Sequence, residues 1–480
     1  MTLQAKQSIK SRFIQYVLPS VAAMWVYTIY TMADGIFVAR GVGEQALAAV
    51  NLCMPMINGA FSMGILFAVG ASTKASIHKG RGDTQESNRV FTLGAMTVAS
   101  IGLLATLFVL LLLPQLARLL GADAHTLPYV KGYLGIIGLF LPFYMTSYYL
   151  EVLVKADGFP KLAIKTSIAG AMTNIVLDAI FVLVFHWGIE GAAVATGLSQ
   201  AMTFSIYLRH FLARRPSRKA ASSAAKSSGE ADGNAAVPAA ANTGFTFVHV
   251  RWQPQAVFRF AKLGLADCVT ELSIGLCIFV FNRTLLAVSG SDGVVIYTVI
   301  SYFAQLVLMT MMGINQGSQP LISYYYGRGK SDFCSYIFRL ALCCAGVCAI
   351  VAFVIGFLCP APIVNIYIDH ETSPDLFARG IRAFRLYAPA FLPLGIVIPM
   401  MGYFTSLELP KQAMSISLGR GMLFAICALL LLAFLFGESG IWISAVVSET
   451  CTLTLALLLY RRSIQNICGN GAVALTENNR

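Results

Sequence analysis

Residues 90–113 read VFTLGAMTVASIGLLATLFVLLLL, a run of 24 residues without one charged side chain. A helix needs roughly 20 predominantly apolar residues to cross the hydrocarbon core of a bilayer. A helix also satisfies its own backbone hydrogen bonds, which a lipid environment requires. This run therefore predicts a transmembrane helix.

Eleven further runs of membrane length accompany this one along the chain. The 480 residues are 57% hydrophobic and only 12% charged, against a usual charged share of about 25%. We predict an all-α polytopic membrane protein with twelve transmembrane helices. The predicted spans are 13–38, 46–72, 90–113, 129–151, 162–185, 189–212, 256–288, 293–320, 335–359, 383–407, 412–436 and 440–460.

The net charge of +12 follows membrane topology. If the N-terminus, the loops after even-numbered spans and the C-terminus share one side, that side holds all but seven of the 34 Lys and Arg residues. An excess of basic residues marks the cytoplasmic side. Both termini are therefore predicted to be cytoplasmic, and nucleic-acid binding is not indicated. The seven exceptions are Arg40, Arg118, Lys131, Arg283, Arg379, Arg382 and Arg385.

The cysteines and the common enzyme motifs point to no cofactor. Most of the eleven Cys residues lie inside apolar spans, and none has metal-site spacing with His. They are interpreted as small buried hydrophobes. The first apolar run is too long for a cleavable signal. The sequence contains neither a nucleotide P-loop nor an HExxH motif, which argues against an ATP-driven pump and against one class of membrane enzyme.

Residues 214–252 interrupt the apolar pattern. This stretch is rich in Ala, Ser and Gly with scattered charges, a composition that cannot bury a core. It is predicted to be a flexible cytoplasmic linker. It separates an N-terminal six-helix lobe, 1–213, from a C-terminal six-helix lobe, 253–480.

The two lobes carry the marks of a duplication. Residues 79–83 (KGRGD) match 326–330 (YGRGK) at an offset of 247 positions, and 159–163 (FPKLA) match 409–413 (LPKQA) at an offset of 250. Gly188 and Gly191 match Gly437 and Gly440 at an offset of 249. A nearly constant offset indicates an internal repeat. Because each repeat has an even number of spans, both insert the same way up, and a pseudo-two-fold axis lies along the membrane normal.

Carboxylates inside predicted spans are the main functional signal, because an ionisable group in a bilayer is costly. Asp34 lies six residues, about 9 Å, below the outer end of its span. Asp178 is about 12 Å deep and Thr196 about 9 Å deep in theirs. Asn174 lies one helical turn before Asp178. These four residues therefore share one level in the outer half of the N-terminal lobe.

Two carboxylates, an amide and a hydroxyl form a plausible oxygen site for Na⁺, and the same carboxylates could exchange protons instead. A buried hydrogen-bond cluster that joins three helices is the structural alternative. The second lobe does not repeat the set. At the matching offsets it carries Phe281, Phe424, Ala428 and Ala445.

Two further acids lie in the C-terminal spans. Glu271 lies near the middle of the span 256–288, one turn after Asp267. It is interpreted as a contact for a cationic substrate or a second coupling site, with an inter-helix hydrogen bond as the alternative. Glu449 matches Gln200 in the first lobe, and this pairing is interpreted as structural.

Three other residues are candidates for roles in transport. Pro19 removes a backbone donor in the helix that carries Asp34, which bends the helix; it is either a conformational hinge or a fixed packing bend. Tyr30 and Met172 belong to a group of aromatic and polarizable side chains that can line an adaptable substrate pocket. Ordinary packing and lipid contact are the alternatives for both.

The sequence resembles the multidrug and toxic compound extrusion (MATE) family in its bacterial form. The residues that carry the resemblance are 32–38 (MADGIFV), 41–49 (GVGEQALAA), 70–73 (GAST) with 80–83 (GRGD), and 174–178 (NIVLD). The resemblance covers both lobes. It implies two six-helix bundles around a V-shaped central cleft, and an antiporter that exports organic cations in exchange for Na⁺ or H⁺.

The resemblance also assigns roles to residues. The family's cation site corresponds to Asp34, Asn174, Asp178 and Thr196, its bending first helix to Pro19, and its seventh-helix acid to Glu271. Some members carry an aspartate in the tenth span, where this chain has no carboxylate before Glu408. A cation site in the C-terminal lobe is therefore not predicted.

Two rival functions fit the same composition. A flippase for lipid-linked precursors would share the architecture, but a basic cleft would suit its pyrophosphate better than these acids. A membrane-embedded transferase would need a clustered catalytic set, which is not found. We therefore expect a monomeric, non-enzymatic exporter in the bacterial inner membrane. Its partners would be organic cations, Na⁺ or H⁺, and lipid.

Overall fold

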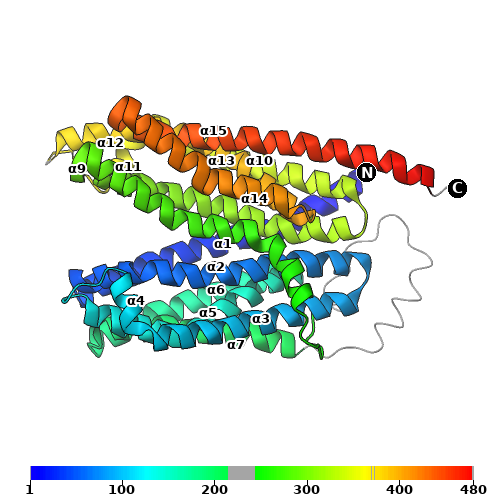
Figure 1. Ribbon diagram of the computed structural model, residues 1–480, viewed down its shortest axis with the longest axis horizontal. Coiled ribbons are helices and arrows are strands. Elements are labelled where there is room, and N and C mark those ends of the chain that lie inside the picture. The colour runs from blue at the N-terminus through cyan, green and yellow to red at the C-terminus, as the bar shows by residue number, and fades with distance from the viewer. Residues whose placement is uncertain (1, 214–243, 369, 372, 478–480) are drawn as a thin grey trace. The chain divides into compact units, whose positions relative to one another are not determined.

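The computed structural model describes residues 2–213, 244–368, 370–371 and 373–477, and all regular secondary structure in these ranges is helical (Figure 1). The all-α prediction is confirmed. The first half contains α1 (Leu3–Gly41), α2 (Glu44–Arg81), α3 (Thr84–Leu111), α4 (Leu113–Leu119), α5 (Leu127–Ala156), α6 (Pro160–Asp178), η1 (Ala179–Val184) and α7 (Gly188–Leu212). The second half contains α9 (Pro254–Gly327), α10 (Ser331–Leu358), α11 (Pro360–Asn365), α12 (Pro374–Tyr387), η2 (Ala388–Ala390), α13 (Phe391–Ser406), α14 (Pro410–Leu418), η3 (Gly419–Leu423) and α15 (Phe424–Glu477).

Ten helical stretches in the described ranges are long and apolar enough to cross a membrane. The stretch Pro410–Ser463 covers two predicted spans, and the backbone leaves the helical region between them at Gly437, with φ 58° and ψ −136°. Helix α7, of 25 residues, covers the predicted span 189–212 but is less apolar than the ten. Each of the twelve predicted spans is therefore helical.

The duplicated sequence motifs lie at corresponding helix ends. Gly82 (φ 83°) ends α2 and Gly329 (φ 69°) follows α9, while Gly188 (φ 64°) and Gly437 (φ 58°) form the second matched pair. Glycine adopts positive φ without the steric penalty that a side chain brings. The repeat therefore preserves the points at which the helices break.

The chain divides into two compact units. Unit 1 comprises Met1–Leu272, Met312–Ala341 and Thr405–Glu408; unit 2 comprises Ser273–Met311, Leu342–Phe404 and Leu409–Arg480. These units follow packing, whereas the predicted lobes 1–213 and 253–480 follow the duplication. Both ends of α9 thus pack with the first-half helices in unit 1.

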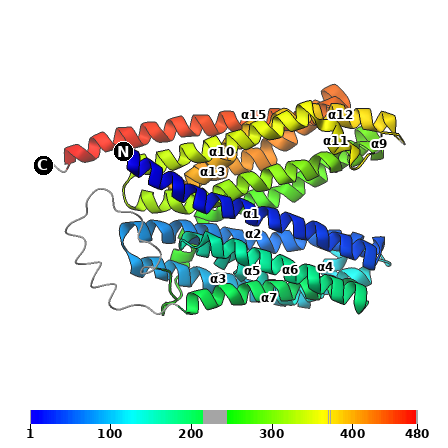
Figure 2. The same cartoon turned by 180° about the vertical axis from the view of Figure 1, so that it is seen from behind.

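In unit 1, α5 lies against α2, α3 and α7, and α1 packs on α6 (Figure 2). Glycines allow α2 and α9 to meet backbone to backbone. A Cβ atom on Gly70 would lie 1.9 Å from the Phe260 carbonyl oxygen, and one on Gly264 would lie 1.9 Å from the Leu66 carbonyl oxygen. Such close approach increases the van der Waals contact that holds helices together in lipid.

Unit 2 has its own apolar core around Trp442 and Phe384, which are 2% and 0% exposed. At one end Arg379 joins two helices of this unit. Its guanidinium lies 3.1 Å from both Asp292 and Glu438.

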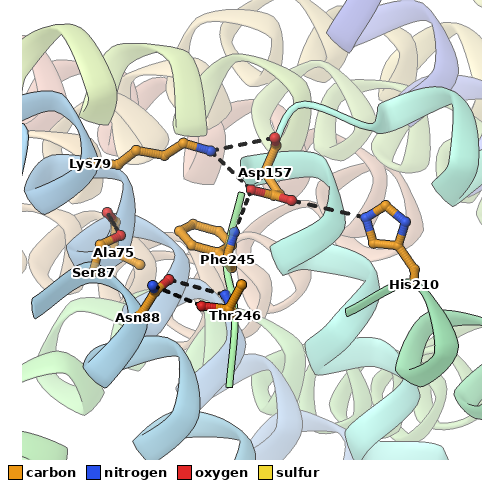
Figure 3. A network of polar contacts seen from close by, with 8 residues as sticks. All are labelled: Ala75, Lys79, Ser87, Asn88, Asp157, His210, Phe245 and Thr246. Atoms are coloured by element: carbon orange, nitrogen blue, oxygen red, sulfur yellow. Dashed lines mark hydrogen bonds and ion pairs between the residues drawn. The ribbon is translucent and has the colours of Figure 1, made fainter. Parts of the chain in front are cut away.

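The structure differs from the linker prediction over residues 244–252, which we call the strap. The strap is extended and bound to unit 1 (Figure 3). The backbone N–H of Phe245 donates to Asp157 Oδ1 at 2.9 Å, and Asn88 exchanges two hydrogen bonds with Thr246. Flexibility is therefore wrong for 244–252, while 214–243 lie outside the described residues.

Charge and aromatic packing anchor the strap. Asp157 is fully buried and lies 3.0 Å from Lys79 Nζ and 4.0 Å from His210 Nε2. Phe245 is 1% exposed, stacks on Phe91 and has Lys79 Nζ 4.8 Å from its ring centroid. A buried carboxylate needs such partners because burial without them is strongly unfavourable.

Substitution Phe245→Ala is expected to lower the free energy of unfolding by about 3 kcal/mol, because it removes a buried ring from a packed aromatic group. Thermal unfolding of the purified chain in detergent checks this. The exposed strap residue His249 provides the matched control, and His249→Ala should leave the melting temperature unchanged. Equal melting temperatures for the two variants would contradict a bound strap.

Candidate functional site

Asp34 and Asp178 come together inside unit 1. Asp34 lies on α1 and is half-buried; Asp178 is the last residue of α6 and is 0% exposed. Helices α1, α6 and α7 pack against one another, and this brings the two carboxyl groups within hydrogen-bonding reach. Asp34 and Asp178, which the sequence placed at one depth, are thus neighbours in the structure.

The surroundings offer this pair few donors. Among the described residues, no N–H or hydroxyl group donates a hydrogen bond to either carboxyl oxygen of Asp178 or to Oδ1 of Asp34. Two ionised carboxylates so placed repel each other, and their burial adds a desolvation penalty. A shared proton or a bound cation would relieve both effects.

Asn174 and Thr196 supply neutral oxygens beside the pair. Asn174 is fully buried one turn before Asp178 on α6, and its Nδ2 donates to Thr196 Oγ1 on α7 at 3.3 Å. The amide oxygen of Asn174 has no donor among the described residues. Carboxylate, amide and hydroxyl oxygens are ligands suited to hard cations.

The described residues contain no group of three or more His, Cys, Asp or Glu side chains that could hold a metal ion. The cluster at Asp34 has two carboxylates and otherwise neutral oxygens. This composition suits Na⁺ or H⁺ better than a transition metal, which favours imidazole or thiolate ligands.

A short π-helical turn, η1, begins at the residue after Asp178. π-Helical turns are rare and are often found at functional sites. Pro19 lies inside α1, which continues through it from Leu3 to Gly41. The hinge role of Pro19 therefore stays a prediction.

Tyrosines extend the cluster toward the middle of unit 1. Tyr30 lies one turn before Asp34, and Tyr133 is near both carboxyl groups. The ring of Tyr30 meets that of Tyr27 edge-on, with centroids 5.3 Å apart. The predicted substrate contact at Tyr30 is therefore adjacent to the carboxyl pair.

Met172 lies on a different face. It is 56% exposed on α6, two residues before the fully buried Asn174. Two positions along an α-helix correspond to roughly 200° of rotation. Met172 thus points away from the four-residue cluster, and its predicted substrate contact stays a prediction.

Glu271 belongs to another group of side chains in unit 1. It is half-buried on α9 and close to the hydroxyl groups of Tyr27, Tyr144 and Tyr148. Asp267, one turn earlier, is 4% exposed. Glu271 therefore interacts electrostatically with tyrosines of α1 and α5.

The second half fills the corresponding positions with apolar packing. Phe281, which matches Asp34, is 8% exposed and stacks on Tyr297 with centroids 5.1 Å apart. Elsewhere in unit 2, Arg420 lies 2.9 Å from Glu449. The matching position in the first half, Gln200, accepts a hydrogen bond from Ser147 at 2.8 Å.

Sequence reasoning missed one buried charge cluster. Lys155 is 1% exposed on α5, and its ammonium lies 2.7 Å from Glu151 and 3.1 Å from the Gln316 side-chain oxygen. The spacing of an acid four residues before a base in an apolar helix was the available signal. The predicted span ended at 151, which left Lys155 outside it.

Comparisons with known proteins extend over nearly the whole chain. The MatE family model matches residues 19–180 and 268–454. The multidrug export protein MepA of Staphylococcus haemolyticus is 23% identical over 457 residues, covering 95% of this chain and 94% of MepA. MepA of Staphylococcus aureus strain MSSA476 is 22% identical over 459 residues, with the same coverage.

Solved structures share the fold. An outward-facing multidrug resistance MATE family transporter of the MOP superfamily has a TM-score of 0.82 at 18% identity, covering 98% of this chain and 100% of that chain. A MOP superfamily transporter from Pyrococcus furiosus, described as having a binding pocket of reverse polarity, also has a TM-score of 0.82 at 18% identity, covering 97% and 99%.

The family model covers well over half of the 480 residues, in both halves of the repeat. The chain therefore belongs to the MatE family, the multidrug and toxic compound extrusion transporters.

Proposed function

We propose that this protein is a secondary antiporter that exports organic, mostly cationic compounds in exchange for Na⁺ or H⁺. The observation that carries the proposal is the proximity of Asp34 and Asp178, three of whose four carboxyl oxygens receive no hydrogen bond from the described residues. The multidrug export relatives support the class of cargo. The protein is then a transporter and not an enzyme.

The coupling ion acts through the charge of the carboxyl pair. In one state Asp34 and Glu271 balance the charge of a substrate that enters from the cytoplasm or the inner leaflet. When Na⁺ or H⁺ binds at Asp34, Asp178, Asn174 and Thr196, the negative charge is neutralised and the hold on the substrate weakens. A bend of α1 at Pro19 accompanies this step. One charge moved across 100 mV supplies about 2.3 kcal/mol.

The access change takes place around the central cleft that the family resemblance implies, by alternating access of the two lobes. We further propose that the chain resides in the bacterial inner membrane as a monomer, with both termini in the cytoplasm. The distribution of Lys and Arg supports this orientation.

A lipid-linked precursor carries a pyrophosphate, so a flippase needs basic groups that remain available for it. In the described spans, the buried Lys155 and the half-buried Arg420 each form an ion pair with a glutamate. Glu271 and Asp267 add negative charge in unit 1. This balance favours a cationic cargo over an anionic one.

Substitution Asp34→Asn should reduce efflux of an organic cation such as ethidium by at least about tenfold, a loss of ~1.4 kcal/mol or more of coupling. Asp178→Asn should have a similar effect, because an amide cannot exchange a proton or a unit charge. Efflux from cells, normalised to protein in the membrane, measures this. Asp332→Asn, at an exposed acid, is the matched control; equal efflux in all three variants would overturn the coupling role.

Substitution Asn174→Ala should separate the two coupling ions. It removes a neutral oxygen that Na⁺ would need as a ligand and that a proton would not. In proteoliposomes with independently clamped Na⁺ and pH gradients, we expect transport driven by Na⁺ to fall about tenfold more than transport driven by protons. Equal losses under both gradients would show that Asn174 does not discriminate between the ions.

A further inference from the structure

The most deeply buried cation of unit 1 is held inside a membrane-spanning helix. Lys155 lies in the last turn of α5, and its side chain is 2% exposed. Lysines near helix ends in membranes normally extend toward the interface, and the nearby Lys161 and Lys165 on α6 are exposed. Lys155 instead directs its ammonium inward to Glu151 and Gln316, at 2.7 and 3.1 Å.

Aromatic side chains continue from this ion pair. Gln316 Nε2 donates to the hydroxyl of Tyr148 at 3.3 Å. The Tyr148 ring meets Phe61 with centroids 4.7 Å apart, and Phe61 stacks on Tyr27 with centroids 6.4 Å apart. These four residues are half-buried, unlike the buried core around them. Aromatic faces attract cations.

The two partners of the ion pair differ in exposure. The Glu151 side chain is 16% exposed, whereas that of Lys155 is 2% exposed. The acid of the pair is thus partly exposed while its ammonium partner is not. Glu271 interacts electrostatically with the hydroxyl group of Tyr148, so a second acid acts on the same group of rings.

A purely structural role explains this arrangement poorly. Replacing a buried ion pair by apolar side chains of similar volume is often neutral or stabilising, so a lobe that needed only stability would gain little from it. A buried charge that is already neutralised can, however, be exchanged for another charge of the same sign.

We propose that Glu151, together with Tyr27, Phe61 and Tyr148, binds the cationic head group of the transported compound, and that the Lys155 ammonium is its built-in competitor. This inference rests on the proposed function and adds a second cation site, separate from Asp34 and Asp178. A substrate must displace the ammonium from Glu151 to bind. The return of Lys155 to Glu151 then promotes release.

The test measures the equilibrium dissociation constant of tetraphenylphosphonium for the purified full chain in detergent, without an ion gradient. Lys155→Met keeps an unbranched side chain one atom shorter and removes its charge, so it should lower this constant about tenfold. Glu151→Gln should raise it about tenfold. The double variant should behave like Glu151→Gln, because the lysine competes only for that carboxylate. Lys165→Met removes the same charge at an exposed site and should change nothing.

Two results would overturn the inference alone: a folded Lys155→Met variant that binds no more tightly than the parent, or an equal gain in the Glu151→Gln background. If Lys155→Met does not fold, Lys155→Arg is the deciding variant. A guanidinium holds a carboxylate in two hydrogen bonds, so this variant should raise the dissociation constant of tetraphenylphosphonium. An unchanged dissociation constant in the Lys155→Arg variant would also contradict the role of Lys155 as a competitor. If the parent chain binds no organic cation, the proposed function itself fails.

Discussion

Two carboxyl groups touch inside a bundle of apolar helices, and no other described group donates a hydrogen bond to three of their four oxygens. Such a contact is tolerable only when a proton or a cation supplies the missing positive charge. The packing of α1, α6 and α7 against one another holds the half-buried Asp34 beside the fully buried Asp178.

The two halves of the duplication have diverged around this constraint. The second half replaces Asp34 by Phe281, whose ring packs on Tyr297, so the corresponding region is an apolar core that needs no ion. It carries a half-buried ion pair elsewhere, between Arg420 and Glu449. The first half thus keeps a pair of neighbouring carboxyl groups where the second half has apolar packing. The breaks at Gly188 and Gly437 remain common to both.

Much of the fold and of the carboxyl cluster could be predicted because helices are regular. Composition fixed the spans, and counting residues along them placed Asp34, Asn174, Asp178 and Thr196 at one depth. The Glu151–Lys155 spacing gave a local signal for the ion pair, but the contact of Lys155 with Gln316, 161 positions away, has no local pattern that could predict it. The strap was missed for the same reason. Its short, irregular sequence has no periodicity, and its order depends on the distant Asp157.

The π-helical turn η1, directly after Asp178, contains one residue more than an α-helical turn would hold. Its hydrogen bonds reach back five positions instead of four. If this surplus residue moved along the helix, every side chain beyond it would rotate relative to Asp178 without any hydrogen bond being lost overall. The hydrogen-bond register at the end of α6 therefore sets the rotation of the segment that leads from Asp178 to α7.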